Sequence, residues 1–161
     1  MASVQEPTGA VYEVLAPEAT TIFGDAMQTL ASSEHFVIRA SYDDVALMAE
    51  HQTPGGPLWE ENQLAILGRL EEIWDFYIDE LGFAPPYYDS PTPYKVNAVI
   101  TDYGYLSGGT FQEPAWGPGQ HPQIQMHYGA TEGYHGMAHE FAHALQNMVS
   151  GADWFDYGGW F

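Results

Sequence analysis

The stretch Tyr134-His-Gly-Met-Ala-His139-Glu140-Phe-Ala-His143-Ala-Leu-Gln146 is the part of the sequence from which the fold and its chemistry are predicted. It contains His-Glu-x-x-His, a pattern in which two imidazoles of one helix bind a zinc ion and the intervening carboxylate acts on a bound water. At about 100° per residue, His139 and His143 lie about 40° apart on a helix, one turn from each other. We therefore interpret this stretch as a zinc-site helix.

The same stretch separates into an apolar face and a polar face. Counted from His139, the positions at about 140° to 240° are apolar; they are Met137, Phe141, Ala144, Leu145 and Met148. Glu140 falls about 100° from His139, at the boundary of the two faces. His135, one turn before His139, shares the polar face, either as an additional ligand or as a neighbour that supports the ligands or faces solvent. The helix is expected to bury its apolar side and present the histidines on the other.

Composition restricts the possible partners. A chain of 161 residues with 45% hydrophobic residues has the size and apolar content of one globular domain. It has 22 acidic residues and only three basic ones, Arg39, Arg69 and Lys95, which gives a formal net charge of −19. This charge repels phosphate backbones and anionic membranes, so we expect neither a nucleic-acid nor a membrane partner. Because cysteine is absent, the strong metal ligands available are His, Asp and Glu.

Hydrophobic periodicity predicts a small α+β domain. Strands are expected at 11–15, 33–39, 94–101 and 122–128, and helices at 18–31, 43–51 and 58–81, with an irregular loop over 102–119. The region of Ser41 and Asp43 is expected to cap the second helix, and Gly82 to end the third. Strand 122–128 leads directly into the histidine helix; it is either an ordinary internal strand or an edge to which an extended substrate adds.

Helix 58–81 has two contrasting faces. The face expected to be buried carries Leu64, Leu67, Leu70, Trp74, Tyr77, Ile78 and Leu81. The other face carries the acidic residues Glu71, Glu72, Asp75, Asp79 and Glu80. Such a run is expected to be a solvated face, the alternative being a surface that binds calcium or a partner.

The third zinc ligand is missing from the histidine helix. A catalytic zinc site needs three protein ligands and an open position for water, and the helix supplies two. A metzincin would have glycine and histidine at the positions of Gln146 and Val149, so that class is excluded. The nearby carboxylates are Asp153 and Asp156, either of which reaches the metal if the chain turns at Gly151.

Two segments resemble those of gluzincin-type metallopeptidases, most closely the Svx-like secreted bacterial proteins. They are Ala138-His-Glu-Phe-Ala-His-Ala-Leu-Gln146 and Tyr157-Gly-Gly-Trp-Phe161. The likeness spans most of residues 33–161. It implies a zincin-like fold with a small mixed sheet, a long backing helix and an active-site helix. It also implies that His139 and His143 are zinc ligands, that Glu140 is the general base, and that the protein is secreted.

In that group the Gly-Gly-Trp-Phe stretch runs into a helix that carries the ligand glutamate. By this resemblance the third ligand lies beyond residue 161, and residues 1–161 form a single zincin-like N-terminal subdomain, the metal-helix subdomain, without its C-terminal subdomain. We expect such a chain to bind zinc weakly and to have little peptidase activity. The first residues, Met-Ala-Ser-Val-Gln-Glu-Pro, do not form a signal peptide.

The sequence thus predicts zinc-dependent hydrolysis of a protein or peptide substrate. Zinc lowers the pKa of its bound water, and Glu140 accepts the proton and delivers it to the leaving amine. One alternative is a non-catalytic module that binds carbohydrate or protein through its aromatics, including Trp59, Trp74, Trp116, Trp154 and Trp160. A second alternative is a scaffold that has kept the helix without the chemistry.

Overall fold

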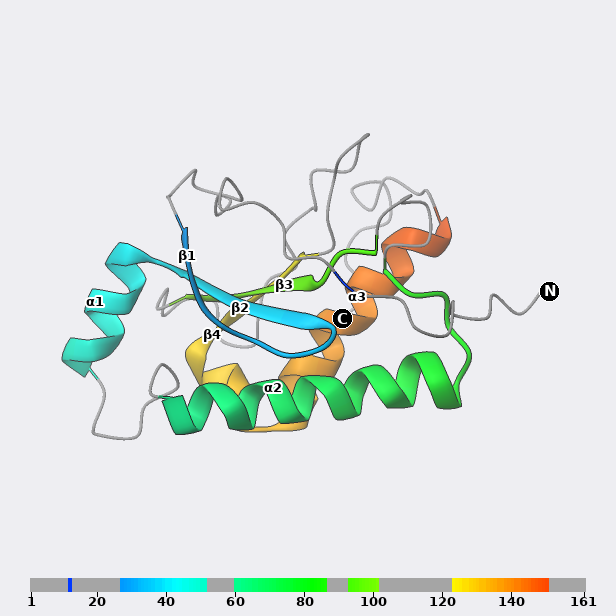
Figure 1. The fold of residues 1–161 in the computed structure, drawn as a ribbon, viewed down its shortest axis with the longest axis horizontal. Coiled ribbons are helices and arrows are strands. Elements are labelled where there is room, and N and C mark those ends of the chain that lie inside the picture. The colour runs from blue at the N-terminus through cyan, green and yellow to red at the C-terminus, as the bar shows by residue number, and fades with distance from the viewer. Residues whose placement is uncertain (1–11, 13–26, 52–59, 87–92, 102–122, 151–161) are drawn as a thin grey trace.

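The computed structural model describes residue 12 and residues 27–51, 60–86, 93–101 and 123–150, which form a mixed α+β arrangement (Figure 1). Four strands form one sheet in the order β1-β2-β3-β4; they are β1 (Met27–Ser32), β2 (Phe36–Ser41), β3 (Val96–Thr101) and β4 (Gln123–His127). β1 is antiparallel to β2, whereas β2, β3 and β4 are parallel. Among the described strands β4 is last in the order, and its role as a substrate edge stays a prediction.

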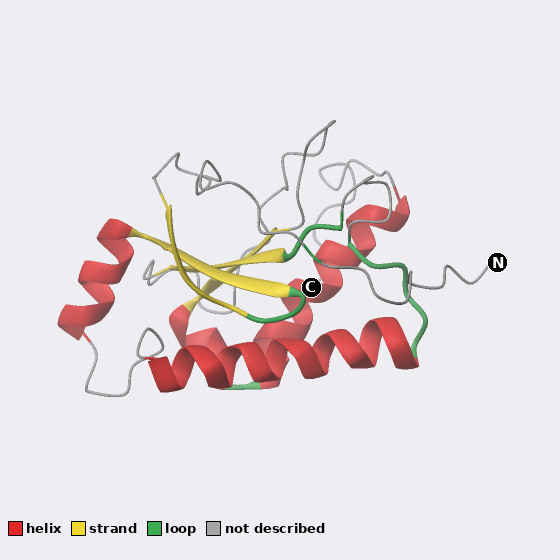
Figure 2. Cartoon of the chain, viewed as in Figure 1, coloured by secondary structure: helices red, strands yellow, loops and turns green. Residues whose placement is uncertain are grey.

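The helices are α1 (Tyr42–His51), α2 (Glu60–Trp74) and α3 (Tyr134–Ser150). A π-helical segment, η1 (Asp75–Glu80), extends α2, and a 3₁₀ helix, η2 (Tyr128–Glu132), precedes α3. Figure 2 shows α2 running along the sheet with α3 behind it. The expected helices 43–51 and 58–81 and strands 33–39, 94–101 and 122–128 are confirmed within the described residues, with shifted ends. The expected loop 102–119 and, apart from Tyr12, the expected strand 11–15 lie outside those residues.

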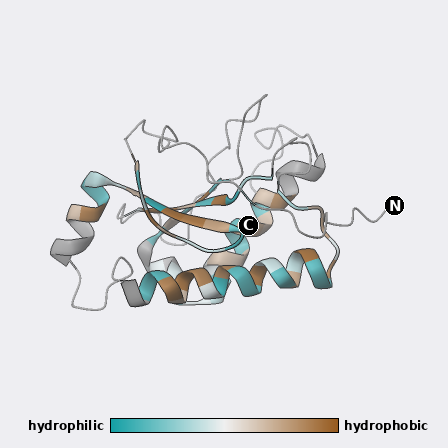
Figure 3. Ribbon diagram, viewed as in Figure 1, coloured by the Kyte–Doolittle hydropathy of each residue, from teal (hydrophilic) through white to brown (hydrophobic). Residues whose placement is uncertain are grey.

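The core lies between one face of the sheet and the two long helices. Alternate strand residues face it: Phe36, Ile38, Ala40, Val96, Ala98, Ile100, Ile124 and Met126. The helices contribute Ile66, Leu67, Leu70, Ile73, Trp74, Met137, Phe141, Ala144 and Leu145. Figure 3 shows the resulting alternation of hydrophobic and hydrophilic residues along α2. Among the described helices, none combines the length and hydropathy that a membrane span requires.

Two expectations about local structure were wrong. Residues 27–31 of the expected helix 18–31 belong to β1, because pairing with β2 outweighs a weak helix preference; residues 18–26 lie outside the description. In α2 and its extension, Leu64 and Leu81 are 61% and 53% exposed. Ile66 and Ile73 are buried instead, because the helix contacts both β2 and α3 and buries a stripe rotated from the predicted one.

The predicted helix ends are confirmed by their capping contacts. The Ser41 hydroxyl accepts a hydrogen bond from the Asp44 N–H at 2.9 Å and donates one to the Asp44 carboxylate at 2.7 Å, which caps α1. At the end of η1, Gly82 has φ +73°, and its N–H donates to the Ile78 carbonyl at 3.2 Å. Glycine adopts this left-handed conformation without the steric cost of a side chain.

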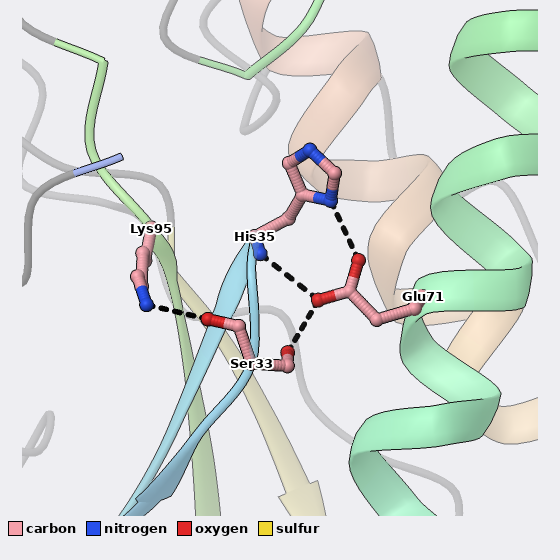
Figure 4. A network of polar contacts seen from close by, with 4 residues as sticks. All are labelled: Ser33, His35, Glu71 and Lys95. Atoms are coloured by element: carbon pink, nitrogen blue, oxygen red, sulfur yellow. Dashed lines mark hydrogen bonds and ion pairs between the residues drawn. The ribbon is translucent and has the colours of Figure 1, made fainter. Parts of the chain in front are cut away.

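A carboxylate on α2 fixes the turn between β1 and β2 (Figure 4). Glu71 accepts hydrogen bonds from the Ser33 hydroxyl, from the His35 N–H at 2.9 Å and from the His35 ring Nδ1 at 2.6 Å. Lys95, directly before β3, donates to the Ser33 carbonyl. Burial alone would raise the pKa of Glu71, but the hydrogen bonds from His35 and Ser33 and the charge of His35 outweigh it and lower the pKa.

We expect Glu71→Gln to lower the free energy of unfolding by about 1–3 kcal/mol, because the amide loses the charge-assisted bond to His35. Since the folded pKa of Glu71 is lowered from 4.5, this contribution is present above about pH 4.5 and is lost as the pH falls through the folded pKa. Urea unfolding at neutral and acidic pH measures both effects. Glu80→Gln, an exposed acid of η1, is the matched control; equal losses in the two variants would contradict the assignment.

Candidate metal centre

All of the His-Glu-x-x-His pattern lies in α3, and the chain enters this helix through a short, ordered connection. β4 passes directly into η2, where the His127 ring nitrogen Nδ1 accepts a hydrogen bond from the Gly129 N–H at 3.1 Å. Gly133 then has an extended backbone (φ −147°) and separates η2 from α3. Six residues, 128–133, therefore connect the sheet to the helix that carries the candidate metal ligands.

Two contacts from α2 hold the beginning of α3. An Arg69 guanidinium N–H donates to the Thr131 carbonyl at 2.6 Å, and the Tyr134 hydroxyl donates to the Glu72 carboxylate. The apolar face of α3 is buried as predicted, with Met137, Phe141, Ala144 and Leu145 at most 1% exposed; the side chain of Met148 lies outside the description. Polar contacts at one end and apolar packing along the back thus fix the rotation of the helix.

The four-residue spacing brings both predicted ligands together on the side of α3 that this rotation leaves partly exposed. The Nε2 atoms of His139 and His143 lie 3.0 Å apart, and the ring planes are nearly perpendicular. Two nitrogen ligands at about 2.0–2.1 Å from a tetrahedral zinc ion lie about 3.3 Å apart. Both rings are partly exposed, so the pair is accessible from outside the core. The same approach in the metal-free chain is a hydrogen bond from one ring to the other.

Glu140 lies between the apolar back and the histidine face of α3. The residue is 1% exposed, and among the described contacts its Oε2 atom has no hydrogen-bond partner. Burial raises the pKa of Glu140 to about 8. A desolvated carboxylate of this kind, next to two converging imidazoles, fits proton transfer better than a structural contact.

The third ligand is not found among the described residues. Within them, no group of three or more His, Cys, Asp or Glu side chains is arranged to hold a metal ion. Asp153 and Asp156 lie outside the description, and His135 is exposed. The described residues therefore bring together two imidazoles that fit zinc and a neighbouring carboxylate, and they leave open which group completes the site.

The contacts that orient α3 were not predictable from the sequence. Arg69 and Thr131 are 62 residues apart in sequence, as are Glu72 and Tyr134. One feature of the sequence pointed to such a contact. Arg69 is one of only three basic residues in a very acidic chain, and it lies next to leucines that are buried, which suggests a structural role for its side chain. Nor did the sequence indicate the buried polar atoms of Asn97 and Gln125 on the sheet face opposite the helices; among the described contacts, the Asn97 Oδ1 and both Gln125 amide atoms have no partner.

We predict that the metal-free protein loses stability as the pH rises, through Glu140. The folded pKa of about 8 lies above the ordinary value of 4.5. The contribution of Glu140 to the free energy of unfolding is therefore fully present below about pH 4.5 and is lost progressively as the pH rises to about 8. Glu140→Gln should remove this pH dependence, a difference on the order of a few kcal/mol between pH 5 and pH 9. Urea unfolding in EDTA measures it, with exposed Glu132→Gln as the control. Parallel pH profiles for native protein and Glu140→Gln would refute the prediction.

Comparison with known proteins places the chain in a family without assigning an activity. No curated protein and no solved structure matches it. The sequence profile of one family of unknown function, DUF6055, matches residues 14–159, a range that includes α3 with both histidines and Glu140. Because the match covers nearly the whole chain, this protein belongs to DUF6055, a family of unknown function.

Proposed function

We propose that this protein is a zinc-dependent metallopeptidase of the gluzincin type, with a zincin-like arrangement of its sheet and helices. The observation that carries the proposal is the 3.0 Å approach of the His139 and His143 Nε2 atoms on one face of α3. A His-Glu-x-x-His spacing by itself can occur by accident, and any two residues at this spacing share a helix face, but their ring nitrogens need not lie close together. Here they converge at nearly the separation that a shared zinc ion requires.

His139 and His143 would hold the zinc ion, which when bound would polarise a scissile carbonyl and acidify a water. Glu140 would accept a proton at the unpartnered Oε2 atom and deliver it to the leaving amine. The burial of Glu140 excludes competing water around this carboxylate. The substrate class of the proposal is a protein or peptide.

The alternative of an aromatic carbohydrate-binding module gains no support from Trp74, the one tryptophan among the described residues. Trp74 is 1% exposed and lies in the core, stacked on His35 with ring centroids 4.1 Å apart. A stacking platform for a sugar needs an exposed ring face. The other four tryptophans lie outside the description.

Zinc titration by calorimetry tests the two ligands. His139→Ala and His143→Ala should each weaken zinc binding by at least about tenfold, because each removes one of few strong ligands. His135→Ala, an exposed histidine of the same helix, should change the affinity little and serves as the control. Asp153→Ala and Asp156→Ala, measured in parallel, show whether either carboxylate completes the site. Zinc affinity that is unchanged in both His139 and His143 variants would overturn the metal assignment.

Glu140→Gln should retain zinc and lose hydrolysis of a denatured protein substrate by about 10²- to 10⁴-fold, because the amide cannot accept the proton. Glu132→Gln, an exposed acid just before α3, should leave the rate unchanged. Rates are compared with zinc content measured on the same samples. Zinc-dependent cleavage that survives in Glu140→Gln would remove Glu140 from the mechanism. Residual cleavage by the native chain that is equal with zinc and with EDTA would refute the peptidase proposal itself.

A further inference from the structure

The end of the α2–η1 helix carries an exposed apolar surface that the candidate metal centre does not use. Phe76, Leu81 and Phe83 are 48%, 53% and 41% exposed. They are joined rather than scattered, because the ring of Tyr77 contacts those of Phe76 and Phe83, with centroids 5.5 and 5.8 Å apart. Isolated exposed apolar residues are ordinary on a protein surface, whereas a contiguous group marks a contact surface.

The π-helical geometry of η1 creates this grouping. The Leu81 N–H donates to the Phe76 carbonyl at 3.0 Å, five residues back, so the two side chains lie one wide turn apart. The Phe83 N–H donates to the Tyr77 carbonyl at 3.0 Å and folds Phe83 back onto the helix end. Segments of π-helix are frequently found at functional sites.

Acidic side chains lie on the same segment as the apolar group. Asp75, Asp79 and Glu80 are exposed on the same six-residue segment. Desolvation raises the pKa of Asp75, and the negative charges of Asp79, Glu71 and Glu34 raise it further. Negative charge is therefore crowded at this end of the helix, next to exposed aromatic rings.

We propose that this acidic–aromatic surface, formed by Phe76, Leu81 and Phe83 with Asp75, Asp79 and Glu80, docks a cationic amphipathic segment of a partner protein. An apolar face of the partner would cover the two phenylalanines and Leu81, and its lysines or arginines would pair with these acids. The inference is independent of the metal centre, and its test requires no catalysis.

Charge complementarity excludes the other occupants. A second copy of this chain lacks free cations for the purpose: Arg39 is 1% exposed, Arg69 donates to the Thr131 carbonyl and Lys95 to the Ser33 carbonyl. These are all the arginines and lysines of a chain of net charge −19, so two copies repel each other. An anionic membrane is repelled for the same reason.

Fluorescence anisotropy with a labelled helical peptide of leucine and lysine, leucines on one face, tests the proposal on the full chain. Two comparison peptides replace lysine by glutamate or leucine by serine. We expect Phe76→Ser/Leu81→Ser to weaken binding at least about tenfold at every salt concentration, because the apolar contact is lost. The Asp75→Asn/Asp79→Asn double variant, which keeps the side-chain shapes, should weaken binding about fivefold at low salt and little at high salt.

Matched control variants show whether the peptide binds at this surface or is attracted by the net negative charge of the whole chain. Leu64→Ser changes a comparably exposed apolar residue of α2, and Asp43→Asn/Glu132→Gln removes two exposed acids elsewhere. Both should bind the leucine–lysine peptide within about twofold of the native chain. Circular dichroism confirms that each variant is folded. The proposal is overturned if the controls weaken binding equally, if the serine–lysine peptide binds as well as the leucine–lysine peptide, or if the native chain binds neither.

Discussion

The packing of Trp74 is the contact on which the arrangement of this structure depends. Its indole stacks on His35, with centroids 4.1 Å apart, and meets Phe36 of β2 and Phe141 of α3 at 5.9 and 5.8 Å. One side chain of α2 thus touches both the sheet and the histidine helix. Because close-packed interiors resist displacement, this contact fixes the distance and rotation of α3 relative to the sheet.

The polar contacts are arranged around this packing and complete it. Glu71, one turn before Trp74 on α2, fixes the β1–β2 turn, while Arg69 and Glu72 hold the approach to α3. The three contacts use neighbouring positions of one helix, so α2 serves as a frame to which both the strand ends and the histidine helix are attached. Through these contacts α2 orients α3, the helix that carries His139 and His143.

Features that depend on a single helix or strand were predictable from the sequence, whereas features that depend on contacts between distant segments were not. The buried face of α3 followed from a period of 3.6 residues, which holds for any regular helix. The exposure of Leu64 and the strand at Met27 did not follow, because each depends on which other element lies against the segment. The partners of Glu71 are 36 and 38 residues away in sequence, and no spacing rule connects them. The approach of His139 and His143 was predictable because both belong to one helix, whereas a group from another element that would complete the proposed site was not.

The carboxylates of Glu71 and Glu140 are both removed from solvent, but they differ in their hydrogen bonds. Glu71 accepts three hydrogen bonds, which stabilise its charge. Glu140 is more deeply buried, yet its Oε2 atom has no partner among the described residues. Asn97 and Gln125 also hold unpartnered buried atoms, but these amides are neutral and cost less to desolvate than a carboxylate. Glu71 shows that this fold can supply hydrogen bonds to a carboxylate, whereas Glu140 has no partner at Oε2 among the described residues. The proposed proton transfer at Glu140 would account for this difference between the two carboxylates.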